Sequence, residues 1–275
     1  MLDELFAYDR SALPDIREVN QQPKGDALVR QFTFATPFHR RRAAYLVRPA
    51  DPTEEQLAAI LYVHWYEPES PDSNRTQFLE EAVQLSGKGV VSLLVETMWS
   101  DRDWFIKRTQ AEDQQNSIEQ VIELRQAMDI LLAEPGIDPG RFAYVGHDFG
   151  AMYGVLMGAV DPRPGAYVLM AGTPSFPDWY LYYPLLEGEA RQEFVKSFEP
   201  LDPISNVSKL APAPLLFQFG ENDVHVPVER GQQFFHAAAA PKEIQWYDAG
   251  HGLSPQASSD RMDWLSRQLK LANGS

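Results

Sequence analysis

The feature that most constrains how this chain folds is a glycine-flanked turn directly after a buried strand. Residues 142–145 read Phe-Ala-Tyr-Val, an apolar run typical of a strand covered on both faces, and residues 146–150 read Gly-His-Asp-Phe-Gly. Helix-forming residues begin at Met152. Glycines, which lack a Cβ, let backbones approach closely at a sharp turn and leave the side chain between them free. The segment therefore predicts a strand, a strained turn that presents Asp148, and a helix.

Similar apolar runs recur along the chain and alternate with helical patterns. Two alternating segments, residues 28–34 and 43–48, predict an antiparallel strand pair. Helical spacing is clearest from Ile118 to Leu132. Continuous apolar runs, which predict strands buried on both faces, occupy residues 58–63, 90–95, 142–145, 166–170 and 215–219. The alternation predicts an α/β fold with a mostly parallel twisted sheet, helices on both faces, and ligand sites at the carboxyl ends of the strands.

The length of 275 residues and the apolar content of 44% suit one large domain. We predict an N-terminal extension over residues 1–27 and a main domain over residues 28–275. Residues 173–208 interrupt the alternation with several aromatics and prolines. They predict a short cap insertion over the sheet, with an ordinary crossover as the alternative. The candidate substrate-binding residues in this segment are Trp179, Tyr180, Tyr182 and Tyr183.

Composition excludes several classes of function. The chain has no cysteine, which excludes disulfides, thiolate metal sites and cysteine nucleophiles and favours a cytoplasmic location. The net charge of −15 disfavours nucleic acids and anionic membranes as partners, and no apolar run approaches the roughly 20 residues of a membrane span. The histidines show no metal-ligand spacing, so we expect no metal and no other cofactor. A small-molecule substrate remains the expected partner, and a homodimer is left open.

Three segments resemble the catalytic loops of a known superfamily. Residues 138–151 resemble the nucleophile elbow of dienelactone-hydrolase-like and prolyl-oligopeptidase-like α/β-hydrolases. Residues 220–227 resemble the loop that carries the acid of that superfamily, and residues 248–252 resemble its catalytic-histidine loop. The resemblance covers roughly residues 28–270. It implies the α/β-hydrolase fold and a triad of Asp148, Asp223 and His251 in the order nucleophile, acid and histidine.

The oxyanion region departs from the superfamily pattern. Relatives carry His-Gly where this chain reads His64-Trp65. The resemblance implies that the backbone N–H groups of Trp65 and Phe149 hold a developing oxyanion. For the Trp65 side chain, packing in the core and projection into the pocket both stay open. We expect His64 to order this loop and His147 to be structural, whereas His225 is close enough to Asp223 to mimic a catalytic base.

The aspartate at the elbow changes the expected chemistry, because most members of this superfamily carry serine there. A carboxylate is already ionised at neutral pH and needs no base to become nucleophilic. Its attack on an ester carbonyl would give a high-energy mixed anhydride, whereas attack on a saturated carbon gives an ordinary ester. The elbow resembles those of haloalkane dehalogenases and epoxide hydrolases, which use this route. By that resemblance His251, oriented by Asp223, would activate the water that hydrolyses the ester.

Three hypotheses remain open from the sequence. The first is a hydrolase in which Asp148 forms an alkyl-enzyme ester. The second is a dienelactone-hydrolase-like ester or lactone hydrolase in which Asp148 acts as a general base or an unusual nucleophile. The third is a binding protein that has kept the fold and lost turnover. The residues around the elbow favour the second and the aspartate favours the first, while the presence of both Asp223 and His251 disfavours the third.

Overall fold

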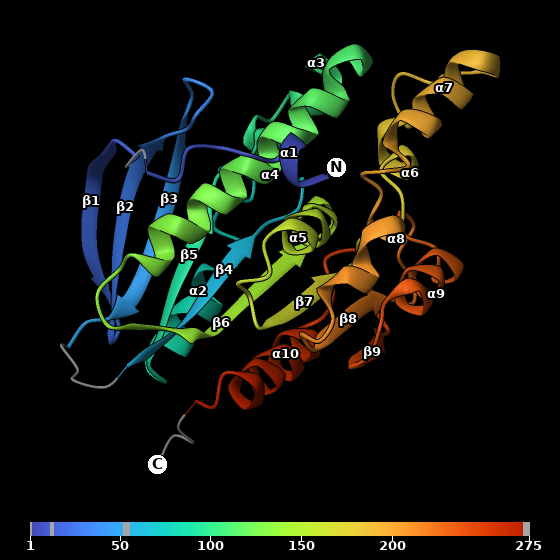
Figure 1. The fold of residues 1–275 in the computed structure, drawn as a ribbon. Helices are drawn as coiled ribbons and strands as arrows, with labels where there is room; N and C mark the ends of the chain where they lie inside the picture. Colours follow the sequence, from blue (N-terminus) through green and yellow to red (C-terminus); the bar gives the residue numbers. More distant parts are fainter. Residues whose placement is uncertain (1, 12–13, 52–55, 272–275) are drawn as a thin grey trace.

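The predicted strands form one sheet whose central members run parallel (Figure 1). The computed structural model describes residues 2–11, 14–51 and 56–271. The strand order is β1-β2-β3-β5-β4-β6-β7-β8-β9, with antiparallel pairing from β1 to β5 and parallel pairing from β5 to β9. The strands are β1 Ile16–Lys24, β2 Ala27–Ala35, β3 Arg41–Pro49, β4 Leu57–Val63, β5 Val90–Val95, β6 Ile137–His147, β7 Ala166–Met170, β8 Leu215–Gly220 and β9 Lys242–Tyr247. The predicted fold class is confirmed.

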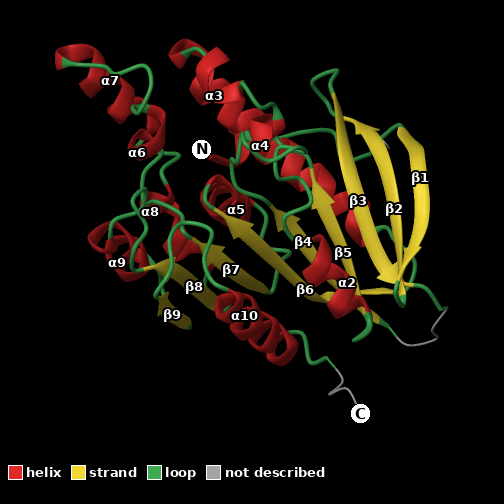
Figure 2. Ribbon diagram, turned by 180° about the vertical axis from the view of Figure 1, so that it is seen from behind, coloured by secondary structure: helices red, strands yellow, loops and turns green. Residues whose placement is uncertain are grey.

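Helices cover both faces of the sheet, which explains the continuous apolar runs. The strands β4, β5, β7 and β8 are buried at every position. One core contains side chains of α4 (Gln110–Leu132), α5 (Phe149–Val160) and α9 (Val228–Ala237). The other contains side chains of α2 (Leu79–Ser86) and α10 (Pro255–Gln268), which lie in front of the sheet in Figure 2. Both faces of these four strands are therefore shielded from solvent.

The segment predicted as an N-terminal extension, residues 1–27, contributes to the same sheet. It contains α1 (Leu2–Leu5) and the edge strand β1, which pairs with β2 along its length. Phe6 is fully buried in the core beside α4 and α5. Nearly every residue of β1 is exposed, so this strand lacks the apolar alternation by which a strand is recognised in sequence.

The segment 173–208 forms a helical layer beyond the carboxyl end of β7. It holds α6 (Pro177–Tyr180), α7 (Gly188–Phe198) and α8 (Pro203–Asn206), followed by η2 (Val207–Leu210). In Figure 1, α6 and α7 project past the sheet, opposite the end of α4 that carries η1 (Met98–Ser100) and α3 (Trp104–Lys107). This placement is that of a cap over the strand ends.

Candidate active site

The turn between β6 and α5 presents Asp148 at the carboxyl edge of the sheet. Asp148 has φ 54° and ψ −116°, a conformation that is strained for a residue with a Cβ. Its N–H donates to the Met170 carbonyl at 2.8 Å, and its side chain is buried. A Cβ on Gly150 would lie 2.2 Å from the Val63 carbonyl oxygen, and one on Gly146 would lie 2.4 Å from Gly150. The two glycines are therefore a steric requirement of the turn.

We expect the Gly150→Ala substitution to destabilise the fold by about 2 kcal/mol or more, because the added methyl group meets backbone that cannot move aside. Urea unfolding measures the loss. Gly87→Ala is the matched control, since its Cβ would lie at an ordinary 3.6 Å from the Gln84 carbonyl oxygen. Equal stabilities of the two variants would contradict the close approach of Gly150 to Val63.

Asp223 and His251 come from the loops after β8 and β9 and meet beside Asp148. The His251 Nδ1–H donates to Asp223 Oδ2 at 2.7 Å. Asp223 Oδ1 accepts the N–H groups of His225 at 2.8 Å and Val226 at 3.1 Å. Burial alone would raise the pKa of Asp223, but these hydrogen bonds and the His251 charge lower it below its usual value. Asp223 is therefore ionised and fixes the proton of His251 on Nδ1, which leaves Nε2 for proton exchange.

Asp148 and His251 form a coupled charge pair. Burial raises the pKa of Asp148 to about 7, against the opposing effects of the His251 charge and of the backbone N–H groups of Phe149 and Tyr66. Burial lowers the pKa of His251, but the Asp223 hydrogen bond and the Asp148 charge outweigh it, and the pKa is raised. Asp148 Oδ1 is buried without a hydrogen-bond partner. One oxygen of the carboxylate thus has no hydrogen bond from the surrounding protein.

The Trp65 N–H, one of the two donors predicted to hold an oxyanion, is engaged in the structure. It donates to Gln77 Oε1 at 3.1 Å. The next N–H along the chain, that of Tyr66, lowers the pKa of Asp148, as does that of Phe149. The sequence could not report the contact with Gln77, because this contact depends on the tertiary fold.

Two histidines, His64 and His147, hold the loop that follows β4 and contains Trp65. His64 Nδ1 contacts the Trp65 carbonyl at 2.7 Å, and burial lowers the His64 pKa to about 4, so its ring is neutral. The ring of His147 contacts Gln77 Nε2 at 2.6 Å and the His251 carbonyl at 2.9 Å. His147 therefore links the oxyanion loop to the catalytic-histidine loop beneath the elbow.

The Trp65 side chain packs against His251. Its ring is stacked on His251, with centroids 4.9 Å apart and an interplanar angle of 5°, and its centroid is 4.6 Å from that of His147. A Cβ on Gly252 would lie 3.0 Å from this indole. The sequence left open whether the indole packs or projects into the pocket. In the structure it packs against these neighbouring rings and also borders the cavity.

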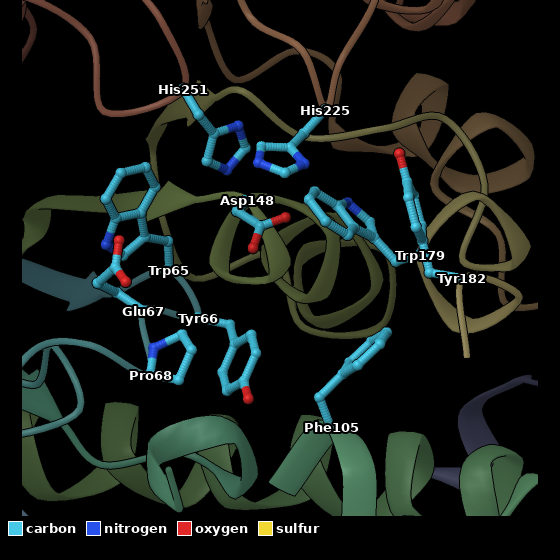
Figure 3. A pocket seen from close by; sticks show the side chains of 10 residues that line it. All are labelled: Trp65, Tyr66, Glu67, Pro68, Phe105, Asp148, Trp179, Tyr182, His225 and His251. Atoms are coloured by element: carbon cyan, nitrogen blue, oxygen red, sulfur yellow. The ribbon is translucent and has the colours of Figure 1, made fainter. Parts of the chain in front are cut away.

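A cavity of about 340 Å³ opens above Asp148 (Figure 3). Its lining is mostly aromatic and comes from six regions of the chain: Trp65, Tyr66, Glu67, Pro68, Phe105, Asp148, Trp179, Tyr182, His225 and His251. The sequence assigned Glu67 and Pro68 no individual role, because their arrival at the cavity depends on how the loop after β4 folds. His225, which the sequence placed near the acid, borders the cavity beside His251, with ring centroids 5.3 Å apart.

Two of the four aromatic residues predicted to bind substrate reach this cavity. Trp179 and Tyr182 line it from the cap. Tyr180 is fully buried, and its hydroxyl contacts the hydroxyl groups of Tyr153 and Ser117 in the core. Tyr183 is 55% exposed and is not among the lining residues. The periodicity of α6 brings one face of the segment to the site and turns the other toward the core.

Among the residues that the structure describes, no group of three His, Asp or Glu side chains is arranged to hold a metal ion. No helix in these residues is long and apolar enough to cross a bilayer. The side chains able to exchange protons in the cavity include the carboxyl groups of Asp148 and Glu67 and the imidazoles of His225 and His251. Proton transfer between these groups is the chemistry that the arrangement can supply.

No family model and no curated protein matches this chain. Among solved structures, it resembles the acetyl xylan esterase from Paenibacillus sp. R4 with a TM-score of 0.80 and 16% identity, over 97% of this chain and 92% of that chain. Acetyl xylan esterase 1 from Thermoanaerobacterium sp. JW/SL YS485 gives a TM-score of 0.78, 17% identity and the same coverage. A putative dienelactone hydrolase from Klebsiella pneumoniae subsp. pneumoniae MGH 78578 gives a TM-score of 0.63 and 17% identity, over 89% and 98% of the two chains. This chain therefore has the α/β-hydrolase fold.

Proposed function

We propose that this chain is a hydrolase of small organic molecules in which Asp148 attacks a saturated carbon. The observation that carries the proposal is that the strained elbow brings the Asp148 carboxylate to the cavity together with His251. With a serine nucleophile, backbone N–H groups beside the elbow hold the oxygen of the substrate carbonyl. Here the N–H groups of Phe149 and Tyr66 lower the pKa of Asp148, which supports a role for them at the oxyanion that forms when water attacks the Asp148 carboxyl carbon.

In the first step, Asp148 Oδ1 forms a bond to the substrate carbon while the bond from that carbon to its leaving group breaks. The leaving group takes the electron pair. A halide departs, whereas the oxygen of an opened epoxide stays on the alkyl group as an alkoxide and takes a proton from solvent water. The absence of a hydrogen-bond partner on Oδ1 supports this role, because no bond has to be broken before attack. The product of the step is an alkyl ester of Asp148.

In the second step, His251 takes a proton from water while the water oxygen bonds to the Asp148 carboxyl carbon. The first step removes the charge of Asp148, which is one of the interactions that raise the pKa of His251. The pKa of His251 therefore falls as soon as the ester forms, and the ring becomes a neutral base. Collapse of the tetrahedral intermediate releases the alcohol, which takes the proton from His251, and restores Asp148 with one oxygen from water.

Single turnover in water enriched in oxygen-18 tests this route. We expect a panel of primary haloalkanes, epoxides, lactones and simple esters to include a substrate whose first turnover places the label in Asp148 and leaves the alcohol unlabelled. Mass analysis of the peptide containing Asp148 measures the label. Turnover that never labels this peptide would overturn the covalent route.

Hydrolysis of an ester or lactone, with Asp148 as general base, is the second candidate. Its support is that the solved structures of similar fold include proteins described as esterases, and that the pKa of about 7 of Asp148 suits a base at neutral pH. In that case the heavy oxygen enters the product acid and Asp148 stays unlabelled. If no compound of the panel is consumed while ligands still bind in the cavity, the result would support a binding protein that has lost turnover.

A further inference from the structure

A second groove of about 610 Å³ adjoins the cavity that contains Asp148. It lies between the cap and the loop that leads into α9, and its lining residues are Thr173, Pro177, Asp178, Leu181, Tyr182, Leu185, Arg191, Val224, His225, Pro227 and Arg230. Tyr182 and His225 line both hollows. The cavity and the groove are therefore immediate neighbours on the two sides of these side chains.

The two hollows differ in charge. The cavity presents two carboxylates, those of Asp148 and Glu67, and the charge of His251 offsets only that of Asp148. In the groove, Arg230 donates to Asp178 through Nε at 3.0 Å and pairs with it a second time through Nη2, so these two charges offset each other. Arg191 has no hydrogen bond or ion pair from its side chain to any described residue, although it lies close enough to Asp178 to affect its pKa. The unbalanced charge of the groove is thus one guanidinium.

The rim of the groove carries exposed apolar side chains. Tyr182 is 54% exposed, Leu185 is 74% exposed and Val224 is 83% exposed, and all three line the groove. Large apolar side chains are exposed together mostly where they meet a ligand or a partner. Since they line the same groove as Arg191, they suit the apolar body of a small molecule.

We propose that the groove binds the distal part of the substrate, and that this substrate is an elongated molecule with an apolar body and a terminal carboxylate that pairs with Arg191. A carboxylate matches a single guanidinium in charge and in its two-pronged geometry. The carboxylates of the cavity repel an anion, so the reacting end is the uncharged one. That the uncharged end reacts rests on the proposed function, whereas binding in the groove does not.

The test compares octanoate with octanamide by isothermal titration calorimetry, because the two differ in charge at one end and neither carries a leaving group on a saturated carbon. We expect the wild-type protein to bind octanoate about fivefold more tightly. Arg191→Gln removes this preference and leaves the affinity for octanamide unchanged. Lys196→Gln is the matched control, since it removes one positive charge from the same helix without touching the groove.

A second variant separates recognition of the body from recognition of the charge. Leu185→Ser is expected to weaken octanoate and octanamide by the same factor, because it removes apolar contact only. Equal affinities of the wild-type protein for the two compounds would overturn the proposal, as would an equal loss of octanoate binding in Arg191→Gln and Lys196→Gln. Since neither compound reacts, failure of the covalent mechanism would leave these results unchanged.

Discussion

Replacing His251 with glutamine is expected to trap the protein as an alkyl ester on Asp148 and to lower steady-state turnover by about a thousandfold. The first step needs the ionised carboxylate. Because the substitution also removes the His251 charge that lowers the pKa of Asp148, the reaction is run at alkaline pH, where Asp148 is ionised. The second step loses the base that activates water. Formation of the ester therefore continues while its hydrolysis stalls, and the covalent intermediate accumulates.

Intact-protein mass measurement after mixing with a substrate reports the trapped ester as an added mass equal to the alkyl group. Fragmentation locates it on the peptide containing Asp148. His225→Gln is the matched control, because His225 borders the same cavity but its ring makes no hydrogen bond to Asp223. Whatever its effect on KM, this variant is expected to accumulate no ester. Accumulation in His225→Gln and not in His251→Gln would reassign the base to His225.

The elbow could be predicted from sequence because its signals are local. The glycines at 146 and 150 and the apolar run before them all lie within ten residues of Asp148, and the observed strand, turn and helix follow that pattern. The same holds for the central strands, whose burial on both faces leaves continuous apolar runs. These parts of the fold are encoded in the order of neighbouring residues.

The features that sequence reasoning missed depend on tertiary contacts. Tyr180 was a candidate substrate contact, but it leaves the site because Ser117 and Tyr153, on two other helices, offer partners for its hydroxyl group in the core. The Trp65 N–H was predicted to hold an oxyanion, but in the structure it donates to Gln77. No periodicity in the sequence reports such contacts, since each joins residues from separate elements.

The substitution Asp148→Asn is expected to abolish the covalent reaction and, at the same time, to stabilise the folded protein at alkaline pH. Burial raises the pKa of Asp148 from 3.8 to about 7, so the folded state holds a proton that the unfolded state releases. The stability this proton provides is present below pH 3.8 and is lost as the pH rises toward 7. Each pKa unit corresponds to about 1.4 kcal/mol. An uncharged asparagine removes the loss, and we expect a gain of about 2 to 4 kcal/mol in the free energy of unfolding at pH 8.

Urea unfolding of the wild-type protein and the variant at pH 4.5 and pH 8 measures this effect, with a smaller difference expected at pH 4.5. Asp223→Asn is the control of opposite sign. The pKa of Asp223 is lowered in the folded state, so its charge stabilises the fold above pH 3.8, and its removal should destabilise the protein most at pH 8. A loss of stability at pH 8 in Asp148→Asn would contradict the buried, unfavourable charge. A gain would mean that Asp148 lowers the stability of the fold. Packing cannot explain an aspartate at such a position, whereas a reaction at its carboxylate can.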